Sequence, residues 1–167
     1  MRSTPARAAL TSPRVLVGAV GQLYQGDLDL GRVAVERLGD LGPEIVVEDL
    51  SYGAVAVAQR LEELAPQRLI LVAAVARGRV PGTVERRSAT AVARTPQEIQ
   101  RSVADAVTGY VHVDLVLDVA HGLGVLPPET LVVEVEPATV EPSERLSPVA
   151  ERALDEALAL IRADLLE

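Results

Sequence analysis

The sequence contains no Cys, Phe, Trp, Lys or Asn, so all 16 of its basic residues are Arg. Without Cys there is no thiolate nucleophile, no disulfide and no Cys-ligated zinc or iron–sulfur site. Without Lys the chain can form neither a Schiff base nor a Walker-A phosphate site. The two His residues are His112 and His121. A three-His metal site is therefore excluded, and a Ser/His/Asp triad would need one of these two.

Positive charge and aromatic side chains are also scarce. The formal net charge is −8, the sequence pI is about 4.8, and aromatic residues make up 2% of the chain. An acidic chain repels phosphate backbones and anionic lipid, and so few aromatics provide no stacking surface for single strands. We expect no nucleic-acid partner.

The length and the course of hydrophobicity predict one domain. Residues 14–167 are expected to form it, after a disordered N-terminal tail at residues 1–13 that lacks the apolar run of a signal peptide. No window of 18 residues is apolar and uncharged. We therefore predict a cytoplasmic protein without membrane insertion.

Short apolar runs alternate with amphipathic stretches, which predicts an α/β fold. The predicted strands are residues 14–20, 44–48, 69–75 and 131–135, with an Arg-rich edge strand over 84–92. The predicted helices are residues 30–41, 53–64, 95–107, 111–123 and 147–166. Short links between the first three strands favour parallel, right-handed crossovers, so loop chemistry gathers at the carboxyl ends of these strands.

Two of these loops carry paired carboxylates. Asp27 and Asp29 follow the first strand, and Glu48 and Asp49 follow the second. Such groups either bind a hard cation or cap the following helix through its backbone N–H groups. The glycine spacing around Asp27 is not that of a dinucleotide site.

His112 precedes a helical stripe formed by Asp114, Asp118 and His121. The stripe is typical of the solvated side of an amphipathic helix. His112 either faces the two carboxylate loops or has a structural role.

The order of these pieces resembles the hydrogenase maturation endopeptidases. The resemblance covers about residues 14–160 and rests on the following ordered set: Gly21, Asp27 and Gly31 after the first strand, Gly53 after the second, Pro81-Gly82-Thr83 after the third, and Leu146-Ser147-Pro148 before the last helix. It implies a three-layer α/β/α sandwich with a mostly parallel sheet of about five strands. It also implies an aspartic-type endopeptidase that removes a C-terminal peptide from the large-subunit precursor of a nickel–iron hydrogenase.

The resemblance also implies three ligands that detect nickel presented transiently by this partner, with no intrinsic cofactor. The acidic ligands map onto Leu28 and Ala73, and the His position falls at about Gly109. None of these side chains binds nickel.

Two explanations stay open. In the first, a shifted site uses Asp29, Glu48 or Asp49, and His112, which suit a borderline divalent metal, with Asp27 as a further catalytic candidate. In the second, the chain is a pseudoenzyme, an assembly chaperone that keeps the fold and the partner surface of a large subunit or another maturation factor.

A different class of function is a binding module unrelated to hydrogenases. Arg79, Arg86 and Arg87 would dock an acidic partner through their forked guanidinium groups. Alternatively, these arginines simply protect an edge strand.

Overall fold

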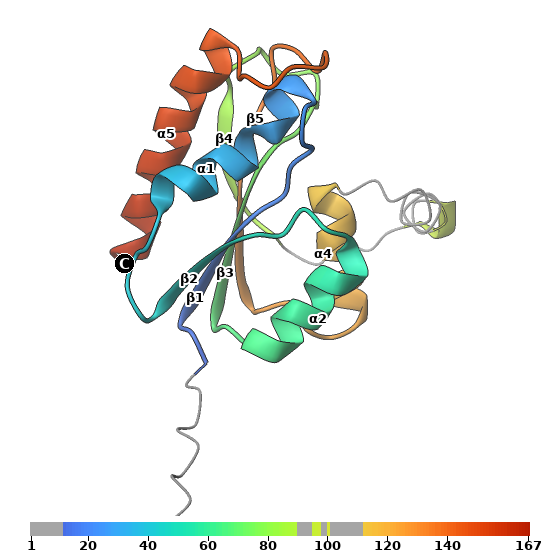
Figure 1. Ribbon diagram of the computed structural model, residues 1–167. Helices are drawn as coiled ribbons and strands as arrows, with labels where there is room; N and C mark the ends of the chain where they lie inside the picture. Colours follow the sequence, from blue (N-terminus) through green and yellow to red (C-terminus); the bar gives the residue numbers. More distant parts are fainter. Residues whose placement is uncertain (1–11, 90–94, 98–99, 101–111) are drawn as a thin grey trace, which may run out of the picture.

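The computed structural model describes residues 12–89, 95–97, 100 and 112–167. Its centre is a five-stranded sheet in the order β2-β1-β3-β5-β4 (Figure 1). The strands are β1 (Val15–Ala19), β2 (Ile45–Asp49), β3 (Arg68–Ala74), β4 (Val84–Ser88) and β5 (Glu129–Val135). All neighbouring pairs are parallel except β4, which runs antiparallel to β5 at the edge. The predicted α/β fold and mostly parallel sheet are confirmed.

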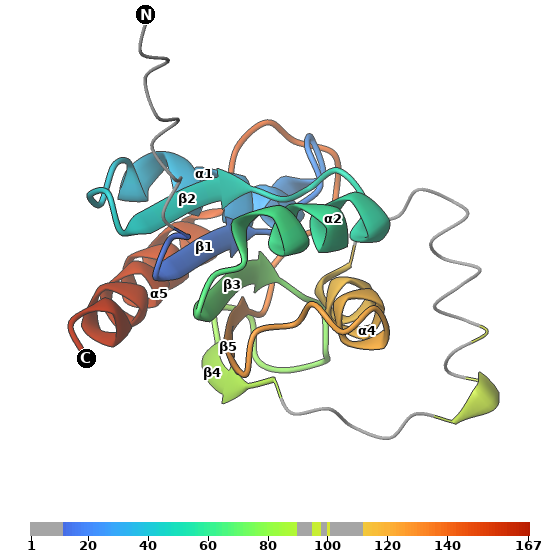
Figure 2. The ribbon, with the colours of Figure 1, turned by 90° about the horizontal axis from the view of Figure 1, so that it is seen from below.

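Helices cover both faces of this sheet. The helices are α1 (Leu30–Leu38), α2 (Ala54–Leu64), α4 (Val113–Gly122) and α5 (Pro148–Leu165), with a short 3-10 helix, η1 (Gly26–Asp29), before α1. Figure 2 shows α1 and α5 on one face, and α2 and α4 on the other. Each pair buries its apolar side chains against its own face of β1, β3 and β5. The chain is thus a three-layer α/β/α sandwich.

The element boundaries follow local chemistry. β1 and β3 read as continuous apolar runs because both faces of the sheet are covered. α1 ends at Leu38 and not at residue 41, because Gly39 adopts a φ of 60° that breaks the helix. At α5 the Ser147 hydroxyl accepts a hydrogen bond from the Ala150 N–H at 3.1 Å, and Pro148 occupies the first helical position.

Some predicted segments fall outside the described residues. These are the tail at residues 1–11, most of the helix predicted over 95–107, and residues 90–92 at the end of the predicted edge strand. Among the residues that are described, no helix is long and apolar enough to cross a bilayer.

The sheet order places a crevice between β1 and β3. From β1 the chain passes to β2 on one side, and then crosses to β3 on the other side. In parallel α/β sheets the loops diverge at such a switch point, so ligands bind there, beyond the carboxyl ends of the strands.

Candidate functional site

A pocket of about 270 Å³ lies at the switch point. Its lining comprises Val20, Gly21, Gln22, Leu28, Ala73, Ala74, Val75, Ala76, His112, Val113 and Val140, and we call it the edge pocket. The start of α1 lies close to it because Gly31 has no side chain. A Cβ at Gly31 would lie 2.8 Å from the Val72 carbonyl oxygen, so only glycine allows this approach.

The wall of the edge pocket is apolar where the resemblance places acidic ligands. Leu28 and Ala73 both line it, and so does His112. Among the described residues, no Asp or Glu belongs to the lining. The Nδ1 atom of His112 accepts a hydrogen bond from the Asp114 N–H at 3.2 Å. The pocket therefore suits uncharged groups better than a cation.

Asp27 is fully buried and ties two loops together. Its Oδ2 accepts hydrogen bonds from the N–H groups of Ala138 at 2.9 Å and Thr139 at 3.1 Å and from the Ser147 hydroxyl at 2.8 Å, and its Oδ1 accepts from the Ser147 N–H at 2.7 Å. All four bonds go to the segment before α5. Asp27 does not form the cap that the sequence indicated for the following helix.

Asp29 is also buried, and it pairs with Arg32 on the first turn of α1. The Arg32 guanidinium donates to both carboxylate oxygens of Asp29 at 2.6 to 3.0 Å. The side chain makes no cap bond to α1, so the capping interpretation is wrong here as well. The hydrogen bonding of Arg32 to the Asp29 carboxylate is the main cause that raises the pKa of Arg32.

Glu48 and Asp49 also have partners of their own. Arg60 on α2 donates to both oxygens of Glu48 at 2.5 and 3.0 Å. Asp49 accepts from the Ser51 N–H at 3.0 Å, and the Ser51 hydroxyl accepts from the Gly21 N–H at 2.8 Å. The loop after β2 is thereby tied to the loop after β1. Neither carboxylate belongs to the lining of the edge pocket.

The shifted site requires Asp29, Glu48 or Asp49, and His112 to converge. Of these candidates, His112 alone lines the edge pocket. Within the described ranges, no group of three or more His, Asp and Glu side chains is arranged to hold a metal ion.

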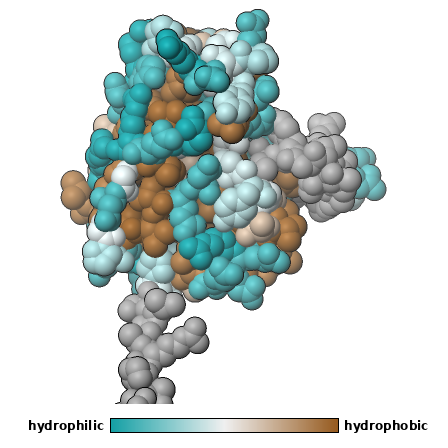
Figure 3. All heavy atoms as spheres, in the orientation of Figure 1, coloured by the Kyte–Doolittle hydropathy of each residue, from teal (hydrophilic) through white to brown (hydrophobic). Residues whose placement is uncertain are grey.

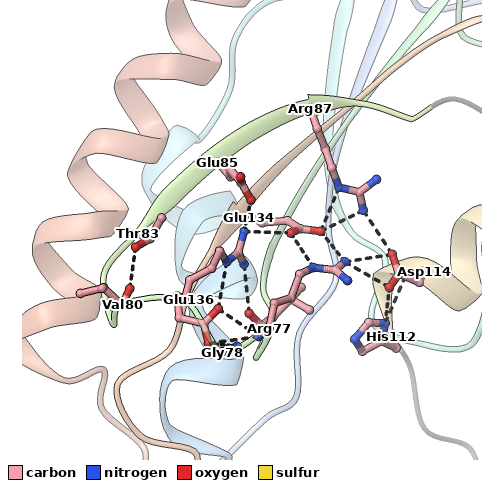
Figure 4. A network of polar contacts seen from close by, with 12 residues as sticks. Arg77, Gly78, Val80, Thr83, Glu85, Arg87, His112, Asp114, Glu134 and Glu136 are labelled. Carbon is pink, nitrogen blue, oxygen red and sulfur yellow. Dashed lines mark hydrogen bonds and ion pairs between the residues drawn. The ribbon is translucent and has the colours of Figure 1, made fainter.

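A second polar region adjoins the edge pocket, and sequence reasoning missed it. Glu134 on β5 is fully buried, and Arg77 binds it through two bonds, Nη2 to Oε1 at 2.6 Å and Nε to Oε2 at 2.8 Å. Arg87 on β4 donates to the same Oε1 at 2.9 Å and also contacts Asp114 at 3.2 Å. Figure 4 shows Glu134 between Arg77 and Arg87, with Asp114 facing both arginines. The group formed by Arg77, Arg79, Arg87, Asp114, Glu134 and Glu136 is the charge cluster.

The electrostatics of the charge cluster keep its buried carboxylates ionised. Burial alone would raise the pKa of Glu134, but hydrogen bonds from Arg77 and Arg87 and their charges outweigh burial and lower it to about 2. Glu136 is buried too, and the N–H groups of Arg77 and Gly78 and the Arg79 guanidinium lower its pKa against the effect of burial. The hydrogen bonding of Arg77 to the Glu134 carboxylate, which accepts, is the main cause that raises the pKa of Arg77.

This cluster corrects two predictions. Asp114 was expected on a solvated stripe, yet it pairs with Arg77 and Arg87. Arg79 contacts Glu134, Glu136 and Glu85, and Arg86 binds Asp164 on α5 at 2.7 Å. The arginines offered as a docking surface are thus neutralised within the chain. One signal could have indicated these pairs: Glu134 in an otherwise apolar strand and Glu136 directly after it require cationic partners when they are buried.

No protein-family model and no curated protein matches the sequence. Solved structures do match. The hydrogenase maturating endopeptidase HybD from E. coli superimposes with a TM-score of 0.70 at 22% identity, over 91% of each chain. A hydrogenase 2 maturation peptidase from a Thaumarchaeota archaeon gives 0.63 at 23% identity, over 91% of this chain and 97% of that one. A [NiFe] hydrogenase maturation protease from Thermococcus kodakarensis gives 0.61 at 17% identity, over 90% and 97%. The chain therefore has the fold of the hydrogenase maturation proteases.

Proposed function

We propose that this chain is a non-catalytic relative of the hydrogenase maturation proteases, which binds the large-subunit precursor of a nickel–iron hydrogenase without cleaving it. The structural likeness extends over nine tenths of the chain, and this supports a partner of the same type. The nickel belongs to the partner, and the chain holds no cofactor of its own. The proposed location is the cytoplasm.

The composition of the edge pocket carries the proposal. The resemblance puts acidic ligands at positions 28 and 73, and both positions lie in the wall of one pocket at the switch point. They are occupied by Leu and Ala, whose side chains have no atom that can bind a cation. Among the described lining residues, His112 is the one imidazole, beside Gln22 and apolar side chains, and a single imidazole ligand holds a divalent metal weakly.

The contacts of the other carboxylates favour the same conclusion. A shifted metal site would have to release Asp29 from Arg32 and Asp49 from its turn with Ser51. Breaking the buried pair of Asp29 costs free energy that metal binding would have to offset.

The test is to incubate the protein with a nickel-loaded large-subunit precursor and to follow complex formation by size-exclusion chromatography and the precursor by intact mass. We expect a complex in which the precursor keeps its full mass. Loss of a C-terminal peptide, stopped by Asp29→Ala or His112→Ala, would establish the shifted peptidase site instead. Absence of any complex would remove the hydrogenase partner from the proposal.

A further inference from the structure

We infer that the edge pocket binds one aliphatic side chain of a polypeptide segment presented by the partner. This inference rests on the proposed function, because it names what the binding site of a non-catalytic relative recognises. In this chain the pocket would recognise an apolar side chain at the place in the fold where the resemblance implies recognition of a metal.

The size and the wall of the pocket carry the first step. Its volume is about 270 Å³, and side chains such as Leu28, Ala73, Val75 and Val113 form most of the lining. An apolar cavity of about 150 Å³ accommodates a benzene molecule, whereas sites for drug-sized molecules start at about 300 Å³. The pocket therefore has room for one branched side chain with part of its backbone, and little more.

The described residues that line the pocket include no Asp, Glu or Arg, and this limits the kind of ligand that can bind. Asp27 and Asp29, the carboxylates on either side of Leu28, are held by the segment before α5 and by Arg32. The cations of the charge cluster are paired with Glu134, Glu136 and Asp114. A charged ligand would lose its hydration in the pocket without gaining an opposite charge, so an uncharged aliphatic group is favoured.

The rim of the pocket favours a polypeptide over a small molecule. Leu23 and Tyr24 follow the lining residue Gln22 in the chain, and Val140 lines the pocket itself. These three residues, which we call the rim, are 53%, 55% and 48% exposed. Their two segments lie side by side, because the Ser143 N–H donates to the Tyr24 carbonyl at 3.0 Å and the Gly26 N–H donates to the Ser143 carbonyl at 3.3 Å. A ligand confined to the pocket would leave Leu23 and Tyr24 in water, whereas a chain passing over the rim would cover them.

Hydrophobic residues elsewhere on the surface provide a control. On the face drawn in Figure 3 they are exposed in separate areas with hydrophilic residues between them. Val80, for example, is 77% exposed and does not line the pocket. Exposure of single apolar residues is common and indicates no site by itself. The combination of rim and pocket is what distinguishes the proposed site.

The experiment uses the full chain and capped pentapeptides, acetyl-Gly-Gly-Xaa-Gly-Gly-amide, with Leu, Ala, Phe or Asp as the central residue. Methyl NMR spectra of the labelled protein report on Leu28, Ala73 and Val140. We expect the Leu peptide to cause saturable shifts of these methyl groups with a Kd on the order of 1 mM, because one side chain supplies little binding free energy. The Ala and Asp peptides should bind at least about fivefold more weakly.

Two exposed valines give a matched pair of variants. Val140→Asp places a carboxylate at the pocket and should weaken the Leu peptide about tenfold, whereas Val80→Asp should leave its Kd unchanged. Because both side chains are exposed, both variants should fold, and their NMR spectra check this.

Four outcomes would overturn the inference: no shift with any peptide, tighter binding of the Asp peptide than of the Leu peptide, tighter binding of the Phe peptide, or equal weakening by the two Val variants. The peptides contain no hydrogenase sequence. A failure here with an intact precursor complex would therefore refute the pocket assignment alone, and the reverse result would refute the hydrogenase partner alone.

Discussion

The edge pocket and the charge cluster lie next to each other and differ in chemistry. Ala76 and Val113 line the pocket. The residues that follow them in the chain, Arg77 and Asp114, belong to the charge cluster. On one side of this boundary the described residues of the wall include no carboxylate, and on the other side Glu134 is buried among three arginines. In the part of the chain that the structure describes, buried carboxylates therefore pair with arginines or backbone N–H groups, and none lines the edge pocket.

A second comparison is between the residues that match the resemblance and the positions that depart from it. The matching residues have structural roles. Asp27 ties the segment before α5, Gly31 allows α1 to approach the sheet, and Ser147 caps α5. The positions that depart from the pattern, Leu28 and Ala73, are those where the resemblance implies metal ligands. The shared residues therefore support the fold, and the departures concern the implied chemistry.

The largest expected effect is that of Glu134→Gln. It removes a buried charge that faces Arg77 and Arg87, so we expect the free energy of unfolding in urea to fall by roughly 3 kcal/mol. The control is Glu85→Gln, since Glu85 is largely exposed and pairs with Arg79 near the surface. That variant should lose less than about 1 kcal/mol. Equal losses in the two variants would contradict a special role of the buried site.

Acid should destabilise the protein through the same carboxylate. The pKa of Glu134 is about 2 in the folded chain against an ordinary value of 4.5. Its contribution is therefore fully present above the ordinary value and is lost as the pH falls through the folded value, by on the order of 3 kcal/mol in total. Urea unfolding between about pH 5 and pH 2 measures this slope. The slope should be clearly smaller in Glu134→Gln, and an unchanged slope would assign the effect to other groups.

Asp27→Ala should cause the next largest loss of stability. It removes four accepted hydrogen bonds and leaves the N–H groups of Ala138, Thr139 and Ser147 without this partner. We expect a loss of about 2 to 3 kcal/mol and faster amide exchange in residues 138–147. Asp40→Ala, which removes one exposed bond to the Gly42 N–H, is the control and should change stability by less than about 1 kcal/mol. Unchanged exchange in residues 138–147 would show that Asp27 does not hold this segment.

Gly31→Ala should reduce the stability of the fold by a smaller amount. The added Cβ would lie 2.8 Å from the Val72 carbonyl oxygen, so α1 must shift, at a cost of about 1 to 2 kcal/mol. Gly122→Ala is the matched control, because a Cβ there meets nothing within 4 Å and Ala favours helix over Gly. Thermal unfolding should separate the two variants, and equal midpoints would argue against the close approach of α1.

The layers of the fold could be predicted from the sequence, whereas the polar contacts between distant residues could not. Apolar runs and helical periodicity identified β1, β2, β3, β5 and the helices α1, α2, α4 and α5, because burial on one or two faces leaves a local pattern. The edge strand β4 was predicted instead from its Arg-rich composition. The contacts of Arg77 with Glu134 and of Asp27 with Ser147 join residues 57 and 120 positions apart. No local spacing encodes such pairs. For the same reason the capping interpretation of Asp27 and Asp29 was wrong. The resemblance singled out Leu28 and Ala73, and both line the edge pocket.

Titration of nickel into the protein, prepared without a His tag, tests the account most directly. Calorimetry should detect no binding to the wild-type chain. The double variant Leu28→Glu with Ala73→Asp should bind nickel, because it adds two carboxylates to the pocket wall that already holds His112. Stoichiometric binding to the wild-type chain that is lost in His112→Ala would contradict the account, because it would show that the edge pocket holds a metal without these two acids.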